Sequence, residues 1–107
     1  MERLKSIIEI DKFIQESKLA FLYISSNNCN VCEALMPKIQ EVLEKYPKII
    51  KKKIVIDDIQ EVSGHLSIFT IPAIIFYIEG KEIFRRARFI SVGEVEALID
   101  RYYKLID

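Results

Sequence analysis

The chain contains two cysteines, Cys29 and Cys32, and two residues separate them. A fold held together by disulfides needs more cysteines, spread along a loop-rich chain. A structural zinc site takes four ligands, and here the others would have to come from carboxylates and the single histidine, His65. Thiol–disulfide exchange is the chemistry that best suits an isolated C-x-x-C pair, and the setting of the pair decides whether it is expected.

The cysteines lie where an apolar segment leads through a polar loop into a predicted helix. The run Leu-Ala-Phe-Leu-Tyr-Ile at 19–24 favours a central strand, and Ser-Ser-Asn-Asn at 25–28 favours a turn. The helix that follows contains Pro37, which should kink it. A helix N-terminus stabilises a thiolate. We therefore expect Cys29, at the cap, to be the exposed nucleophile and Cys32, one turn inside, to be the more buried resolving thiol.

The remaining elements must hold this helix start in place. Apolar periodicity and a capping box at 91–94 indicate helices at 7–18, around 59–66 and after Ser91. Apolar or alternating runs indicate strands at 53–56, 73–78 and 82–89, the last a half-exposed edge strand. Strands joined through a helix pair in parallel, whereas the tight turn at Gly80 implies antiparallel pairing. These signals predict one α/β domain over 1–107, with a mixed sheet and helices on both of its faces.

Composition narrows the function classes. Half of the 107 residues are hydrophobic, which is typical of a globular protein. Sixteen basic and sixteen acidic residues balance, whereas a nucleic-acid binder needs a basic field. No apolar run approaches the roughly 20 residues that span a bilayer, and the N-terminus has no signal-peptide pattern. We expect a cytoplasmic protein with no nucleic-acid or membrane partner.

Residues around the cysteine pair make the chain resemble the thioredoxin-like family. The motif Cys29, Asn30, Val31, Cys32 matches the redox motif of that family. Pro37, five residues after the second cysteine, matches the proline that kinks the active-site helix. The resemblance covers nearly the whole length of the chain.

Three later positions extend the resemblance. Ile71–Pro72, just before the strand at 73–78, matches the cis-proline of the family, and Gly80 matches the glycine between its last two strands. Asp57 matches the end of the family's central strand, which puts Lys53 at the position of a lysine near the active site.

The resemblance implies a thioredoxin fold with a mixed sheet of four to five strands. It also implies an enzyme, a dithiol–disulfide oxidoreductase without a cofactor, that acts as a monomer on disulfide-bearing protein substrates and is regenerated by a reductase. Ile71 and Pro72 would form a cis peptide packed against the cysteines. A proline has no N–H, so the backbone before it can present itself to an extended substrate.

Two departures from the family concern the thiol chemistry. Asn28 stands where thioredoxins usually carry tryptophan, and Asn30-Val31 replaces Gly-Pro, which bears on the reduction potential. Tyr23 replaces the buried aspartate that helps to take the proton of the resolving cysteine. A tyrosine is a poor base at neutral pH, and Lys53 stabilises an anion without accepting a proton. We predict slower resolution of a mixed disulfide than in a typical thioredoxin.

A third departure concerns the substrate groove. Arg88, followed by Phe89, takes the place of a glycine beside the active site. Its side chain would narrow the groove and add positive charge. The alternative is a solvated arginine on an edge strand, together with Arg85 and Arg86.

Two other functions stay open at this point. A non-catalytic adaptor would use the groove around Pro72, Arg88 and Phe89 to hold one partner, and its cysteines would matter little. Metal or iron–sulfur ligation, through dimerisation around Cys29, is the second alternative. The chain has no Gly-Gly-x-x-Asp segment after the hairpin, which disfavours glutaredoxin-like use of glutathione. His65 has nothing in the sequence to bring it near the cysteines, so we expect it to be structural or solvated.

Overall fold

The computed structural model describes residues 1–106 and contains the predicted elements in the predicted order. The helices and strands, with one 3₁₀ turn, η1, are α1 (Ile7–Glu16), β1 (Leu19–Ser25), α2 (Asn30–Glu44), β2 (Ile50–Val55), η1 (Ile56–Asp58), α3 (Val62–Leu66), β3 (Ala73–Ile78), β4 (Lys81–Ala87) and α4 (Val92–Tyr103).

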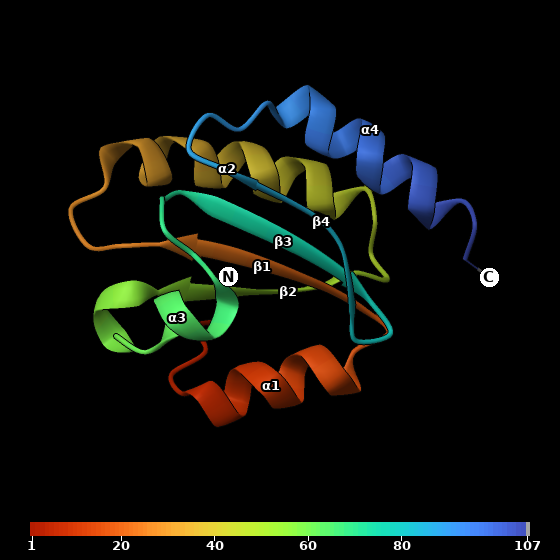
Figure 1. Cartoon of the computed structure of the whole chain (residues 1–107). Helices are drawn as coiled ribbons and strands as arrows, with labels where there is room; N and C mark the ends of the chain where they lie inside the picture. The colour runs from red at the N-terminus through yellow and green to blue at the C-terminus, as the bar shows by residue number, and fades with distance from the viewer. Residues whose placement is uncertain (107) are drawn as a thin grey trace.

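The four strands form one mixed sheet in the order β2-β1-β3-β4. β1 pairs with β2 in parallel, whereas β1 with β3 and β3 with β4 are antiparallel. Helices α2 and α4 cover one face of the sheet, and α1 and α3 lie on the other (Figure 1). The predicted mixed sheet with helices on both faces is therefore confirmed.

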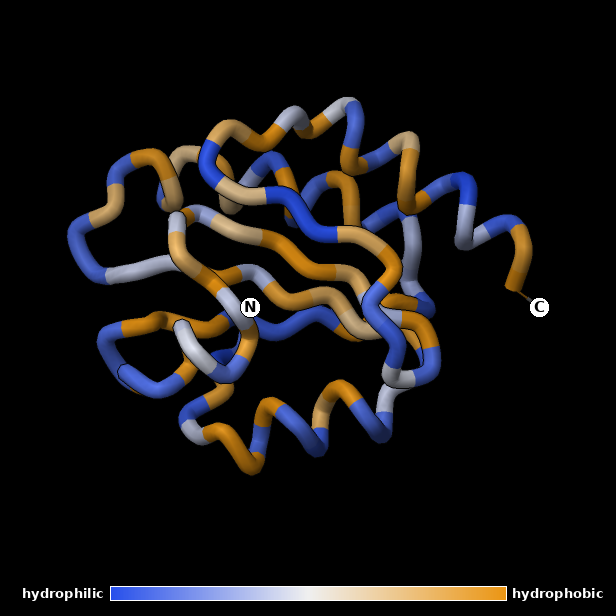
Figure 2. Tube along the Cα trace, in the orientation of Figure 1, coloured by the Kyte–Doolittle hydropathy of each residue, from blue (hydrophilic) through white to orange (hydrophobic). Residues whose placement is uncertain are grey.

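The apolar character of β1 follows from its place inside this sheet. All seven of its residues are buried. Alternate side chains enter opposite cores, so that Leu22 packs on the side of α1 while Phe21 and Tyr23 pack on the side of α2. Hydrophobic residues follow β1 and β3 between the two helical layers (Figure 2). A strand covered on both faces needs a continuous apolar run, which is the signal that the sequence carries.

Strand β2 differs from the prediction in where it begins. It starts at Ile50 rather than Lys53, because Lys51, Lys52 and Lys53 pair with the buried residues of β1. All three lysines therefore belong to the strand. Lysine has a low strand propensity, and pairing with the central strand β1 outweighs that propensity here.

The outer side of β2 carries the remnant of a fifth strand. Arg3 forms an isolated parallel bridge with Lys53. The Lys53 N–H donates to the Glu2 carbonyl at 2.8 Å, and the Leu4 N–H donates to the Lys53 carbonyl at 2.9 Å. In the order β2-β1-β3-β4, β2 is the outer strand of the four, and the segment around Arg3 pairs with its outer side. Asp57, expected at the end of a central strand, lies beyond β2 in η1.

Several helix boundaries also differ from the prediction. α1 ends at Glu16 instead of 18, because Ser17 turns extended and leads the chain into β1. In α3, Ile59 lies outside the helix. The Ser91 hydroxyl accepts the Glu94 N–H at 3.2 Å, as a capping box requires. The Glu94 carboxylate pairs with Arg86 at 2.9 Å, and this ion pair replaces the second capping-box bond, from the Ser91 N–H to the Glu94 carboxylate.

Across residues 1–106, none of the helices combines the length and the apolar character needed to cross a membrane.

Candidate active site

The two cysteines form a disulfide at the start of α2. Cys29 is the N-cap residue, and Cys32 lies one turn inside, with 5.2 Å between their Cα atoms. The Cys29 Sγ accepts the Cys32 N–H at 3.2 Å. Cys29 is partly exposed, whereas Cys32 is 3% exposed. The positions are those expected from the sequence, with one accessible sulfur and one shielded sulfur.

The polar loop before Cys29 aims the chain into the helix. Asn28 adopts a left-handed backbone conformation with φ 59°, which asparagine tolerates better than most residues. The Asn27 N–H donates to the Asp57 Oδ1 at 2.8 Å, which ties the loop to η1. Asp57 thus anchors the loop that carries the cysteine pair, a role that its sequence position did not reveal.

The Ile71–Pro72 segment and the end of β4 meet beside this region. The Ile71–Pro72 peptide bond is cis. The Arg88 N–H donates to the Pro72 carbonyl at 2.8 Å, which fixes the backbone of Arg88 against the proline. Arg88 has φ 71°, a conformation that favours glycine and costs an arginine about 1 kcal/mol. The Arg88 guanidinium lies 5.1 Å from the centre of the Phe89 ring.

A shallow hollow of about 430 Å³ joins α2 to the β4–α4 loop. Val31, from between the cysteines, lines it together with Arg88 and Phe89. Phe89 is 86% exposed and Val31 is 62% exposed, so apolar surface is presented to solvent at this edge. The structure therefore brings Val31, Arg88 and Phe89 together, as the substrate-groove interpretation requires. Asn30 is exposed in the first turn of α2 and is not among the residues lining the hollow.

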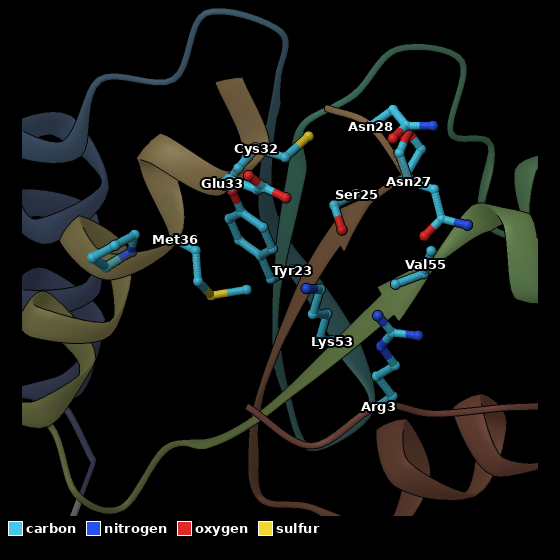
Figure 3. Close-up of a pocket in the computed structure, with 12 residues that line it drawn as sticks. Arg3, Tyr23, Ser25, Asn27, Asn28, Cys32, Glu33, Met36, Lys53 and Val55 are labelled. Carbon is cyan, nitrogen blue, oxygen red and sulfur yellow. Dashed lines mark hydrogen bonds between the residues drawn. The ribbon is translucent and has the colours of Figure 1, made fainter. Parts of the chain in front are cut away.

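A second and larger hollow, of about 640 Å³, lies on the other side of Cys32. We call it the Cys32 cavity. Twelve residues line it, and Figure 3 draws them as sticks: Arg3, Tyr23, Ser25, Ser26, Asn27, Asn28, Cys32, Glu33, Met36, Pro37, Lys53 and Val55.

Tyr23 forms the floor of the Cys32 cavity and holds α2 in place. Its side chain is fully buried, and its hydroxyl donates to the Cys32 carbonyl at 2.6 Å. Burial raises the pKa of Tyr23 to about 12. Tyr23 is therefore a neutral hydrogen-bond donor at physiological pH and cannot serve as a base.

Charged groups surround the same cavity. Lys53 is the register partner of Tyr23 across β1 and β2, so both side chains reach the cavity from neighbouring strands. Arg3 reaches it from the bridging segment and also pairs with Asp58 at 3.4 Å. Glu33 enters from the first turn of α2. Sequence reasoning identified Lys53 and Tyr23 but not Arg3 or Glu33, because only the folded chain shows that they share a cavity.

His65 lies outside this site. Its Nε2 is 2.6 Å from the Asp11 Oδ1, which links α3 to α1 on the opposite face of the sheet (Figure 1). Within residues 1–106, no group of three or more histidine, cysteine, aspartate or glutamate side chains is arranged to hold a metal ion.

Comparison with known proteins gives a consistent result. The family model described as Thioredoxin matches residues 6–101. The thioredoxin-like protein YdfQ of Bacillus subtilis is 38% identical over 107 residues, which cover all of this chain and 96% of that protein. A thioredoxin of Mycoplasmoides gallisepticum is 27% identical over 99 residues, covering 92% of this chain and 99% of its own.

Solved structures agree in fold. The structure of a Plasmodium falciparum thioredoxin superimposes with a TM-score of 0.85 at 22% identity, covering 95% of this chain and 99% of that one. That of thioredoxin O2 from Arabidopsis thaliana, in its oxidised state, gives a TM-score of 0.84 at 22% identity, with 95% and 93% covered. The expected fold is thereby confirmed.

Proposed function

This chain belongs to the thioredoxin family and is a thiol–disulfide oxidoreductase, and we propose that it works as a reductant of protein disulfides. The observation that carries the proposal is the asymmetry of the cysteine pair. Cys29 is accessible at the N-terminus of α2, and Cys32 is shielded directly behind it. The Cys29 sulfur can therefore react with a substrate disulfide, and the Cys32 sulfur can then displace the substrate from Cys29.

The proposed reaction has two exchanges. In the first, the Cys29 thiolate attacks one sulfur of a substrate disulfide, so that a Cys29–substrate bond forms and the substrate S–S bond breaks. In the second, Cys32 attacks Cys29, which forms the Cys29–Cys32 disulfide and releases the substrate as a dithiol. The substrate gains two electrons and the protein loses two. A partner reductase must return them before the next cycle.

The start of α2 supports the first exchange. The first N–H groups of a helix lack partners within the helix and favour a negative charge at its N-terminus. The Cys29 sulfur already accepts the Cys32 N–H. The same contact, together with the other N–H groups of this turn, would stabilise the thiolate of the reduced protein.

We place the substrate segment in the groove between Val31 and the β4–α4 loop. The Ile71 backbone beside Pro72 would pair with an extended substrate, and Val31 and Phe89 would contact its side chains. Arg88 supports a preference for substrates with an acidic residue near the disulfide, because its guanidinium lies at the same hollow. We also propose that the protein acts in the cytoplasm, where a reducing environment keeps such a dithiol active.

Two cysteine variants test the proposal. Cys29→Ser should abolish reduction of a protein disulfide, whereas Cys32→Ser should accumulate a mixed disulfide between Cys29 and the substrate, visible by mass spectrometry. Full activity in both variants would refute the mechanism. If a double Cys→Ser variant captured the same partner with unchanged affinity, the adaptor function would be favoured instead.

A further inference from the structure

Resolution of the mixed disulfide requires the Cys32 thiol to lose a proton. The thiolate is the attacking form, and Cys32 is 3% exposed. Water and dissolved bases therefore reach Cys32 mainly by way of the cavity that it lines. Tyr23, which is fully buried, donates its hydroxyl hydrogen to the Cys32 carbonyl and stays neutral. The proton must leave by another route.

The Cys32 cavity offers that route. Its volume of about 640 Å³ is sufficient for many water molecules. Its walls carry the Ser25 and Ser26 hydroxyls and the Asn27 and Asn28 amides, which can hold water by hydrogen bonds. Water held by these groups would connect Cys32 with the other side chains that line the cavity.

Four ionisable side chains other than Cys32 itself face this cavity: Arg3, Tyr23, Glu33 and Lys53. Arg3 and Lys53 are cations, which have no free site for a proton, and Tyr23 is already protonated. Glu33 contributes the carboxylate of the set, and Figure 3 shows its side chain at the start of α2, near Cys32. Of these four side chains, Glu33 is the one with a carboxylate to accept a proton.

We propose that Glu33 receives the proton of the Cys32 thiol through water in the Cys32 cavity during resolution, an inference that rests on the proposed disulfide exchange. As the Cys32 S–H proton passes to water and on to the Glu33 carboxylate, the Cys32 sulfur attacks Cys29. The Cys29–Cys32 bond forms and the Cys29–substrate bond breaks. The departing substrate thiolate takes a proton from solvent, and Glu33, which is exposed, returns its own proton to solvent.

Two cationic side chains that line the same cavity bear on this proton transfer. Lys53 lies beside Tyr23 on the neighbouring strand and stabilises negative charge that develops at Cys32. Arg3 is partly neutralised by Asp58 at 3.4 Å, so it contributes less. In this role Glu33 is a positioning residue, because it acts through water and not directly on the reacting sulfurs.

The test distinguishes proton transfer to Glu33 from a purely electrostatic effect of its carboxylate on Cys32. The reduced protein is mixed rapidly with dithiobis(nitrobenzoate), and release of the coloured thiol is followed from pH 5 to 9. The first phase reports attack by Cys29 and the second reports resolution by Cys32. In Glu33→Gln the second phase should slow by about tenfold near pH 7, since one proton acceptor is lost. The first phase should stay within about twofold of the wild type.

The opposite sign would overturn the inference. A carboxylate that acted only by its charge would repel the Cys32 thiolate, so its removal would speed the second phase. An unchanged or faster second phase in Glu33→Gln therefore refutes the role. Glu33→Asp should restore part of the rate. Glu44→Gln, an exposed glutamate at the other end of α2, is the matched control and should leave both phases unchanged. A wild-type protein without a second phase would instead refute the proposed function.

Discussion

Removal of the Tyr23 hydroxyl group tests how much its hydrogen bond to the Cys32 carbonyl stabilises the fold. The hydroxyl joins β1 to α2 through its bond of 2.6 Å to the Cys32 carbonyl, inside a fully buried environment. A phenylalanine at this position keeps the ring and its packing. A buried hydrogen bond contributes about 0.5–1.5 kcal/mol, and an acceptor left without that partner adds a further penalty. We expect Tyr23→Phe to lower the free energy of unfolding by about 1–2 kcal/mol at pH 7.

The same substitution has the opposite consequence at alkaline pH. Burial raises the pKa of Tyr23 to about 12, whereas an unfolded tyrosine ionises near 10. The stabilisation is thus fully present below pH 10 and is lost as the pH rises towards 12, by up to about 1.4 kcal/mol per pH unit. Tyr23→Phe cannot ionise, so its stability falls less steeply there. The gap between variant and wild type should narrow between pH 10 and 12.

Urea unfolding followed by circular dichroism, at pH 7 and at steps up to pH 11.5, measures both effects. Tyr77→Phe is the matched control. Burial also raises the pKa of Tyr77 to about 12, but its hydroxyl makes no hydrogen bond to the other residues of 1–106. Tyr77→Phe should therefore show the alkaline effect with almost no loss at pH 7. A Tyr23→Phe protein as stable as the wild type at pH 7 would refute the reasoning.

Three further predictions concern the groove, the cavity and the loop. Arg88→Gly should raise the free energy of unfolding by about 0.5–1 kcal/mol, because φ 71° suits glycine, and urea unfolding will show whether it does. Lys53→Met should raise the pKa of the Cys32 thiol by less than about one unit, because a nearby positive charge is lost. The pKa is measured from the alkylation rate of Cys32 against pH, in a protein that also carries Cys29→Ser. An unchanged pKa would contradict the placement of Lys53 at the cavity. Asp57→Ala should cost about 1 kcal/mol and slow the first exchange, because the loop loses its 2.8 Å anchor; unchanged kinetics would show the anchor to be dispensable.

The sequence predicted what local patterns can express. The apolar run of β1 and the cap at Ser91 each carry their own signal and formed as expected, whereas the alternating strand β4 formed but ends at Ala87 instead of 89, because Arg88 turns left-handed. The placement of Cys29 at the cap of α2 followed from the polar loop before it. These features depend on residues close in the chain.

What the sequence did not predict depends on distant contacts. β2 begins three residues earlier than expected, since pairing with β1 overrides the preferences of its lysines. The Glu94 carboxylate forms an ion pair with Arg86 of β4 instead of a capping bond within its own helix. Arg3 lines the same cavity as Cys32 although 28 residues lie between them in the sequence, and Glu33, the next residue after Cys32, lines it as well. Their periodicity marks them only as surface positions.

The central claim is that Cys29 and Cys32 exchange two electrons with a partner. Equilibrating the protein in a series of glutathione redox buffers, alkylating free thiols and weighing the products tests it directly. We predict a single two-electron transition between a dithiol and the Cys29–Cys32 disulfide, at about −220 to −270 mV, as suits a reductant. If no intramolecular disulfide formed at any potential, the account of this protein as an oxidoreductase would be contradicted.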